Sequence, residues 1–233
     1  MMRILVTRPE DDAAPLAQLL QARGHDVTLE PLLRIRFRDV PLSLDNVQAV
    51  LFTSANGVRA AARATPDRSL AAWCVGDASA RAARDAGFQS VSSASGDVHA
   101  LAALVRRLGD PAKGPLVHVA GSAVAGDLAG TLTAAGFNVR RAVLYDSEAA
   151  TALSEATLGA LRAGHIDAVA LFSPRTARTF AKLARDAGVE PMLTKVDMLC
   201  LSRPVADALG TLPHRHRRVA AEPTQDALIE LIA

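Results

Sequence analysis

The stretch "ILVTRPEDDAAPLAQLLQARGHDV" (residues 4–27) occurs again, in altered form, as "LVHVAGSAVAGDLAGTLTAAGFNV" (116–139). Each copy has the pattern of a strand, a loop, an amphipathic helix that ends at a glycine, and a second strand. Without a gap, apolar positions and the final glycine coincide: Leu16 with Leu128, Leu20 with Leu132, Gly24 with Gly136 and Val27 with Val139. The sequence therefore predicts a β-α-β unit that is present twice.

Longer segments of strands and helices repeat as well. They are 45–63 with 164–184, 73–87 with 199–210, and 94–105 with 221–232. The chain therefore runs as short unit, long run, short unit, long run. Two arrangements satisfy this order: successive domains of 1–112 and 113–233, or a middle domain of about 38–146 with the first short unit joined to the last long run. The repeat alone leaves both open.

The linkers after the two short units are extended and polar. "LEPLLRIRFRD" corresponds to "RRAVLYDSEA", with Leu32 opposite Leu144. Apolar and polar residues alternate from Leu33 to Arg38, which predicts a strand whose solvent-exposed face carries three arginines. In the nested arrangement both linkers cross between the domains as an antiparallel two-stranded ribbon. A ribbon hinge explains arginines on a strand that helices cover poorly.

Composition favours an α/β protein. Half of the 233 residues are hydrophobic but only 3% are aromatic, and small aliphatic side chains suit helices packed on parallel sheets. A net charge of +2 argues against a general nucleic-acid binder. No apolar run has the roughly 18 residues of a membrane span, and the N-terminus enters a strand directly, so we expect a cytoplasmic protein. Cys74 and Cys200 lie in apolar runs and are expected to be buried.

Six loops stand where a predicted parallel strand ends and a helix begins. They are "VTRPE", "FTSANGVR", "VGDASA", "VAGSAVAG", "LFSPRTAR" and "LSRPVA". Ligands bind at this edge of open α/β sheets, because helix N-termini present unpaired N–H groups there. Each Ser, Thr, Asn or Gly is also an ordinary helix cap, but six such loops on two facing domains would line a cleft suited to an anion.

Motifs for other chemistries are missing from the sequence. There is no dinucleotide fingerprint, P-loop, nucleophile elbow or metal-binding His/Glu helix. The cluster "HRHRR" (214–218) has the pattern of a solvated loop before a strand "VAA", and His118 is isolated, as expected for a surface or internally satisfied residue. Tyr145, the single tyrosine, is either a proton donor facing a cleft or a half-buried packing residue.

The chain resembles the uroporphyrinogen-III synthase family over essentially its whole length. The segments that carry the likeness are "ILVTRP", "LFTSANGVRA", "CVGDASARAA", "AAGFNVRRAVLYDS", "LFSPRTARTF" and "AAEPTQDALIEL". The resemblance implies two flavodoxin-like parallel-sheet α/β domains joined by a two-stranded β-ribbon, and therefore the nested arrangement. The expected bounds are 1–36 plus 148–233 for domain 1, 38–146 for domain 2, and about 31–39 and 142–148 for the linkers.

The resemblance also implies an activity. Members of this family are lyases that cyclise the linear tetrapyrrole hydroxymethylbilane, with inversion of the last ring and loss of water, to uroporphyrinogen III. On this reading the partner is that small molecule, no cofactor or metal is needed, nucleic acid and membrane are not bound, and the protein is a monomer. The alternative is a non-catalytic hinge-binding protein of the same architecture for a small acidic ligand.

Site residues follow from the family's motifs. Tyr145 occupies the place of the linker tyrosine proposed as the acid. The expected substrate-binding residues are Thr7, Arg8, Thr53, Ser54, Asn56, Gly57, Ser79, Ser122, Ser173, Ser202 and Arg203. Three positions depart from the family pattern, since Val205 and Ser79 stand where a threonine is common and Phe172 stands where a threonine precedes Ser173.

Overall fold

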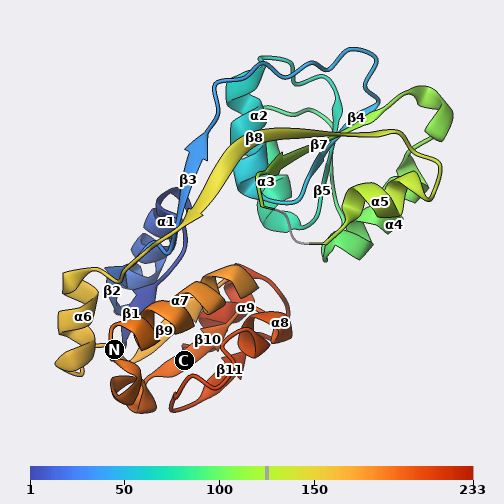
Figure 1. The fold of residues 1–233 in the computed structure, drawn as a ribbon. Helices are drawn as coiled ribbons and strands as arrows, with labels where there is room; N and C mark the ends of the chain where they lie inside the picture. Colours follow the sequence, from blue (N-terminus) through green and yellow to red (C-terminus); the bar gives the residue numbers. More distant parts are fainter. Residues whose placement is uncertain (124–125, 233) are drawn as a thin grey trace. The chain divides into compact units, whose positions relative to one another are not determined.

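The chain forms two compact units in a computed structural model that describes residues 1–123 and 126–232 (Figure 1). Unit 1 comprises Met1–Arg34 and Glu148–Ala233, and unit 2 comprises Ile35–Ser147. Strands from both ends of the chain therefore enter unit 1, whereas unit 2 is one continuous segment. The chain leaves and re-enters unit 1 within two strands, β3 (Leu33–Phe37) and β8 (Val139–Ala149).

Unit 1 is built on a five-stranded sheet in the order β11-β10-β9-β1-β2, with parallel neighbours throughout. Numbered by their order within the unit, the strands stand as 2-1-3-4-5, which is the order of flavodoxin-like folds. Their bounds are β1 Arg3–Val6, β2 Asp26–Leu29, β9 Ala168–Leu171, β10 Asp197–Cys200 and β11 Arg217–Val219.

Unit 2 has a six-stranded sheet in the order β3-β8-β7-β4-β5-β6. The pairs from β8 through β6 are parallel. If the repeated short unit, β7 and β8, is counted first, these five strands also stand as 2-1-3-4-5. The remaining bounds are β4 Ala49–Phe52, β5 Ala71–Cys74, β6 Val91–Ser93 and β7 Leu116–Gly121. The predicted α/β class with two parallel, flavodoxin-like sheets is confirmed.

The strand registers reproduce the sequence repeat residue by residue. In unit 1, Ile4 pairs with Val27 on one side and with Ala168 on the other. In unit 2, Leu116, which aligns with Ile4, pairs with Val139 and with Ala49. These two partners align with Val27 and Ala168. The two sheets are therefore copies of one structure that the chain enters at different strands.

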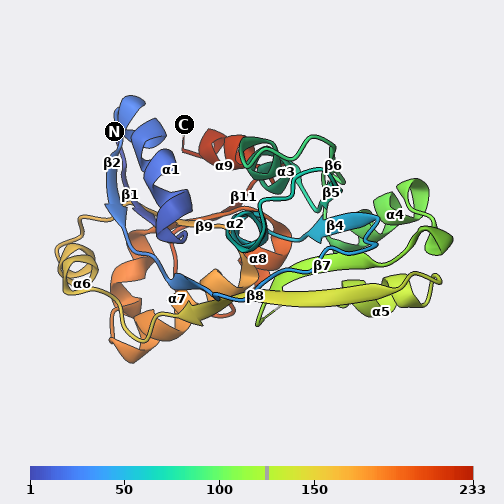
Figure 2. The ribbon, with the colours of Figure 1, turned by 90° about the horizontal axis from the view of Figure 1, so that it is seen from above.

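Helices cover both faces of the unit 1 sheet. Leu5 faces a core formed with α6 (Glu155–Arg162), α7 (Pro174–Asp186) and α8 (Arg203–Asp207). Its neighbours Ile4 and Val6 face the opposite core, formed with α1 (Glu10–Ala22) and α9 (Gln225–Glu230), as Figure 2 shows. The central strands β1, β9 and β10 are mostly apolar on both faces because both faces are buried, as is usual in parallel sheets.

Unit 2 repeats this layering. Val50 and Phe52 face α2 (Ala55–Ala64) and α3 (Asp77–Asp85), and Ala49 and Leu51 face α4 (Val98–Leu108) and α5 (Leu128–Thr133). Short 3-10 helices are present at Pro111–Lys113 in unit 2 and at Glu190–Lys195 in unit 1.

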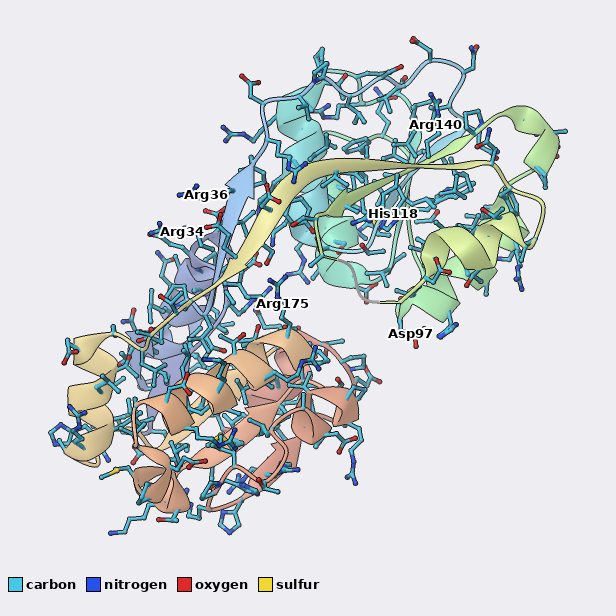
Figure 3. All side chains as sticks on the ribbon, in the orientation of Figure 1. Arg34, Arg36, Asp97, His118, Arg140 and Arg175 are labelled. Atoms are coloured by element: carbon cyan, nitrogen blue, oxygen red, sulfur yellow. The ribbon has the colours of Figure 1, made fainter. Side chains whose placement is uncertain are left out.

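Strand β3 contains the alternating arginines. Its side chains alternate between buried or half-buried apolar residues and exposed arginines, and Figure 3 shows Arg34 and Arg36 on one side of the strand. It lies beside β8 in the sheet and runs in the opposite direction (Figure 1), and the Arg38 N–H donates to the Leu144 carbonyl at 2.8 Å. The Arg38 guanidinium also binds the Asp146 carboxylate at 2.8 Å. The two linkers therefore pair, and the hinge role stays a prediction.

The expectation that both cysteines are buried is confirmed in the described residues. Cys74 and Cys200 are fully buried, free, and at equivalent points of the two sheets, and burial raises the pKa of Cys74 to about 12 and that of Cys200 to about 11. No helix in the described part of the chain is both long enough and apolar enough to span a membrane.

Candidate functional site

The predicted site residues fall in both units. Unit 2 holds Thr53, Ser54, Asn56, Gly57, Ser79, Ser122 and Tyr145, and unit 1 holds Thr7, Arg8, Ser173, Ser202 and Arg203. Nearly all of them follow the carboxyl end of a parallel strand, where the chain turns into a helix. Two residues of the loop after β7, Val124 and Ala125, lie outside the described residues.

Tyr145 lies in β8 next to the end of β7. The register shifts there by one residue, so that Ala120 pairs with Val143 but Gly121 pairs with Tyr145. The tyrosine is 7% exposed, and a Cβ added to Gly121 would come within 2.7 Å of its ring carbon Cε2. A bulge and a residue without a side chain therefore determine the position of this ring.

Ser54 links the phenol to a helix N-terminus. As the N-cap of α2, its Oγ accepts the Gly57 N–H at 3.1 Å, which anchors the serine side chain. The same Oγ lies 2.9 Å from the Tyr145 hydroxyl. The helix cap therefore positions a hydrogen bond between the two hydroxyls.

Thr53, one residue earlier, has a different partner. Its Oγ1 lies 3.1 Å from Nε2 of His118, a β7 residue that is 4% exposed. Burial, and secondly the positive charge of Arg141, lower the pKa of His118 to about 4, so the imidazole is neutral at neutral pH. His118 is thus internally satisfied, and its contact with Thr53 depends on strand register, which sequence reasoning did not detect.

The other unit 2 residues support the same loops. Asn56 Oδ1 accepts a hydrogen bond from Arg59 at 2.7 Å, and Ser79 is buried in α3. The Ser122 N–H donates to the Tyr145 carbonyl at 2.9 Å. Hydrogen bonds from Arg38 and then from the Ser122 hydroxyl lower the pKa of Asp146 to about 2.

In unit 1, Thr7 and Arg8 follow β1. Thr7 is fully buried and donates to the Ala170 carbonyl at 2.7 Å, so its hydroxyl joins two neighbouring strands. The Arg8 guanidinium lies 4.6 Å from the centre of the Phe172 ring and donates to Oε1 of Gln225 at 2.9 Å. Phe172, which departs from the family pattern, therefore provides an aromatic face for Arg8. Sequence reasoning missed Gln225.

Ser173, Ser202 and Arg203 begin the next two helices. Ser173 caps α7 by accepting the Thr176 N–H at 3.1 Å. Ser202 precedes α8 without making a side-chain cap, and Arg203 is 81% exposed in an i,i+4 pair with Asp207. These two side chains are the least constrained members of the predicted set.

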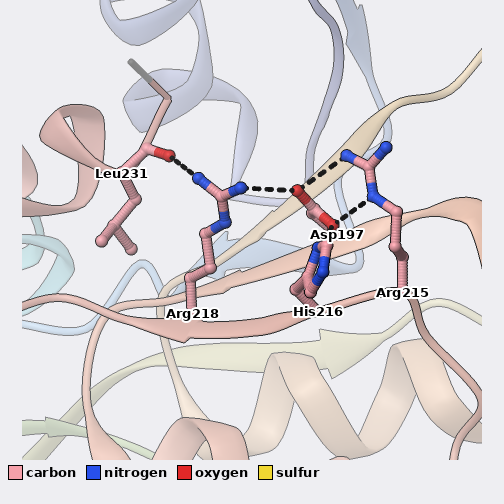
Figure 4. A network of polar contacts seen from close by, with 5 residues as sticks. All are labelled: Asp197, Arg215, His216, Arg218 and Leu231. Carbon is pink, nitrogen blue, oxygen red and sulfur yellow. Dashed lines mark hydrogen bonds and ion pairs between the residues drawn. The ribbon is translucent and has the colours of Figure 1, made fainter.

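The reading of "HRHRR" as a solvated loop is correct only in part, since Arg215 and His216 are exposed loop residues that nonetheless bind a buried carboxylate. Strand β11 already begins at Arg217, and Asp197, which is fully buried at the start of β10, binds three residues of the cluster (Figure 4). Arg215 binds this carboxylate at 2.8 Å, His216 at 3.0 Å and Arg218 at 3.4 Å. The cluster therefore neutralises a buried charge at the amino end of the sheet, remote in topology from the carboxyl-end loops.

Metal ligation has no support in the described residues. Within 1–123 and 126–232, no three or more His, Cys, Asp or Glu side chains are grouped so that they could hold an ion. The chemistry available in unit 2 is that of hydroxyl groups, backbone N–H groups and arginines, which can bind carboxylates and transfer a proton.

Comparison with known proteins gives a family and a fold. Residues 14–230 match the family model described as uroporphyrinogen-III synthase HemD. A search of curated proteins found no match. Uroporphyrinogen-III synthetase from Helicobacter pylori superposes with a TM-score of 0.67 at 15% identity, covering 100% of this chain and 98% of that chain. A mutant uroporphyrinogen III synthase from the extremely thermophilic bacterium Thermus thermophilus gives 0.58 at 19% identity, covering 100% and 97%. At these identities the two structures show a shared fold.

Proposed function

The chain belongs to the uroporphyrinogen-III synthase family, and on that premise we propose that it cyclises hydroxymethylbilane to uroporphyrinogen III. The family is one of cyclising lyases in tetrapyrrole biosynthesis, and membership does not favour the alternative of a non-catalytic binding protein. The observation that carries the chemistry is the 2.9 Å hydrogen bond between Tyr145 and Ser54 at the carboxyl end of the unit 2 sheet.

The reaction needs little covalent assistance from the protein. The C–O bond of the hydroxymethyl group breaks, and its oxygen leaves as water after accepting a proton. The nitrogen of the same pyrrole ring stabilises the resulting cation by resonance. The cation is attacked by the α-carbon of the last ring that already carries the methylene bridge, which forms the closing C–C bond. The bond from that carbon to the bridge then breaks, and the bridge bonds to the free α-carbon of the same ring, which loses a proton. The ring is thereby inverted, and the net change is loss of one water. The protein has to fold the chain correctly and help the hydroxyl to leave.

We assign proton donation to Tyr145. Its phenol O–H is a hydrogen-bond donor, and Ser54 and Gly121 hold it in one place. The eight carboxylates of the substrate need N–H groups, hydroxyls and guanidinium groups for binding. For that role we propose the residues named from the family motifs: Thr7, Arg8, Thr53, Ser54, Asn56, Gly57, Ser79, Ser122, Ser173, Ser202 and Arg203.

The direct test is the identity of the product. Protein is added to freshly prepared hydroxymethylbilane, and the products are oxidised and separated as porphyrin isomers. The proposal expects the type III isomer, whereas spontaneous closure in heat-inactivated protein gives type I. Formation of type I alone by the native protein would overturn the proposal.

We further propose that the reaction is cofactor-free and that the protein acts as a monomer without nucleic acid. Protein dialysed against a metal chelator should retain its rate. Sedimentation at assay concentration should give the mass of one 24.4 kDa chain.

A further inference from the structure

Three polar side chains lie on one face of the unit 2 sheet, two within neighbouring strands and one just after the strand beside them. His118 in β7 is in register with Leu51 of β4 and with Arg141 of β8. Thr53 stands two residues beyond Leu51 and so projects from the same face of the sheet. The three residues therefore form a row across β4, β7 and β8, and we call Thr53, His118 and Arg141 the polar row.

His118 and Thr53 are joined by a hydrogen bond of 3.1 Å. The imidazole is almost fully buried and neutral at neutral pH, so it acts as one donor and one acceptor. This contact restrains the threonine hydroxyl and determines whether it donates or accepts toward a third group.

Arg141 has a charge that no carboxylate neutralises within residues 1–123 and 126–232. Its Nη2 donates to two backbone carbonyls, that of Gly121 at 2.7 Å and that of Ser122 at 3.0 Å. By contrast, Arg38 binds the carboxylate of Asp146. The carbonyls hold the Arg141 guanidinium at the loop after β7 and leave its positive charge available to an anion.

Resting on the synthase function proposed above, we propose that the polar row is a subsite for one substrate carboxylate. Arg141 supplies the charge-assisted hydrogen bonds, Thr53 supplies a hydroxyl, and His118 is a positioning residue that orients Thr53. The carbonyls that hold Arg141 belong to Gly121 and Ser122, and both of these residues also contact Tyr145.

The structure provides a matched control for the charge. Arg140 precedes Arg141 in β8, so its side chain leaves the other face of the sheet, as its position and that of His118 in Figure 3 show. It too donates to a backbone carbonyl, that of Asp45 at 3.1 Å. Arg140→Gln and Arg141→Gln therefore change the net charge equally and differ in the face that loses it.

The test compares steady-state kinetics of type III isomer formation. Arg141→Gln should raise KM about 10- to 100-fold, the range for a lost charge-assisted hydrogen bond, with kcat changed by less than about threefold. Arg140→Gln should leave both constants within about twofold. Equal effects of the two variants on KM would overturn the subsite. They would show that substrate binding depends on the overall positive charge of the protein and not on a contact with Arg141.

The role of His118 is tested by non-additivity. His118→Leu and Thr53→Val should raise KM by similar factors, and the double variant should be no worse than Thr53→Val alone. His118→Gln, which keeps a hydrogen-bonding group near Thr53, should restore part of the loss. If His118→Leu lowers the melting temperature and leaves KM unchanged, the residue is only structural and the proposal fails.

The outcomes also separate this proposal from the proposed function. Wild-type protein that forms only the type I isomer removes the premise and the subsite together. Wild-type protein that forms type III, with an Arg141→Gln variant of unchanged KM, leaves the function standing and overturns the subsite alone.

Discussion

Tyr145 and Ser54 together carry two hydroxyl protons. One proton is used in their mutual hydrogen bond, and Ser54 Oγ also accepts the Gly57 N–H. The second proton is therefore free to point to a third group, from the phenol if Ser54 donates within the pair and from Ser54 if the phenol donates. The pair can deliver a proton from either oxygen, which makes Ser54 more than a helix cap.

Removing the phenol hydroxyl should slow the reaction without unfolding the protein. We expect Tyr145→Phe to lower kcat about 10²-fold, the lower end of general acid catalysis, because the cation is already stabilised by resonance. The type III isomer should still dominate, since folding of the substrate does not depend on this proton. Initial rates and isomer ratios measure both effects.

A variant of Ser54 separates its role in proton transfer from its role as the cap of helix α2. Ser54→Ala should cost about 1 kcal/mol of stability through the lost cap and should lower kcat as well. Combined with Tyr145→Phe it should add little to the loss of rate, because the two hydroxyls act as one donor. A rate for Tyr145→Phe equal to that of wild type would exclude the phenol as the acid.

At the scale of elements, the closeness of helix α2 to strand β7 depends on a single glycine. A Cβ on Gly57 would meet the Val119 carbonyl oxygen at 2.9 Å, and a backbone atom in a sheet moves little. Gly159 in α6 is also helical, but a Cβ there would meet nothing within 4 Å. The two positions therefore form a matched pair.

Alanine should have opposite effects at these two glycines. Gly57→Ala should lower the free energy of unfolding by about 1–3 kcal/mol because α2 must move away from β7. Gly159→Ala should raise it by about 0.5–1 kcal/mol through the smaller entropy of the unfolded chain. Urea unfolding at equilibrium measures both, and equal signs would contradict the packing described for α2.

The pairing of β10 with β11 includes an ion cluster in which one buried carboxylate, that of Asp197, is bound by half-exposed basic side chains. A hydrogen bond from Arg215 is the largest cause that lowers the pKa of Asp197, to about 2 from 3.8, and His216 and Arg218 add to it. Because the pKa is lower in the folded state, the cluster stabilises the protein above about pH 4. This contribution is lost as the pH falls from about 4 to about 2.

In the Asp197→Asn variant, the free energy of unfolding should therefore depend less on pH between about 4 and about 2 than it does in wild type. We expect a loss of about 3 kcal/mol at pH 7, the effect of removing one partner of a buried ion pair, and little difference from wild type near pH 2. Asp207→Asn, which removes an exposed partner of Arg203, should change stability by less than about 1 kcal/mol. Thermal melts at pH 2, 4 and 7 compare the three proteins.

At the scale of the whole molecule, each unit contains its own two cores. Unit 1 encloses one core on each face of its sheet, and so does unit 2. In unit 1 the Ala150 N–H donates to the Leu32 carbonyl at 3.0 Å, so the two chain segments that would have to be joined already lie side by side. The domain bounds inferred from the sequence are a prediction that excision can test.

Both units should fold when they are separated. We expect the fragment 35–147, and a fusion of 1–34 to 148–233 through two glycines, each to unfold cooperatively in thermal melts. Neither alone should form the type III isomer, because the proposed site residues are divided between them. Dispersed amide spectra identify folded fragments, and fragments that stay unfolded would show that the units depend on each other.

Much of the fold could be predicted from the sequence because the patterns that indicate strands and helices are local and occur twice. The strand-loop-helix pattern of 4–27 predicted its equivalent at 116–139, and the register shared by Ile4 and Leu116 follows from that alignment. The ion pairs of the "HRHRR" cluster were missed because their common partner, Asp197, is buried in the neighbouring strand. Charge density alone does not show whether a basic cluster faces water or a carboxylate.

The sequence by itself determined the class, the repeated strand-helix units and the family, since all three depend on periodicity and on motifs along the chain. Only the tertiary structure decided which side chains meet. Ser54 contacts Tyr145 across 91 positions, Thr53 contacts His118 across 65, and Arg8 contacts Gln225 across 217. Such contacts depend on strand order, register and a one-residue bulge at Gly121, which place side chains to within an ångström and leave no periodic trace in the sequence.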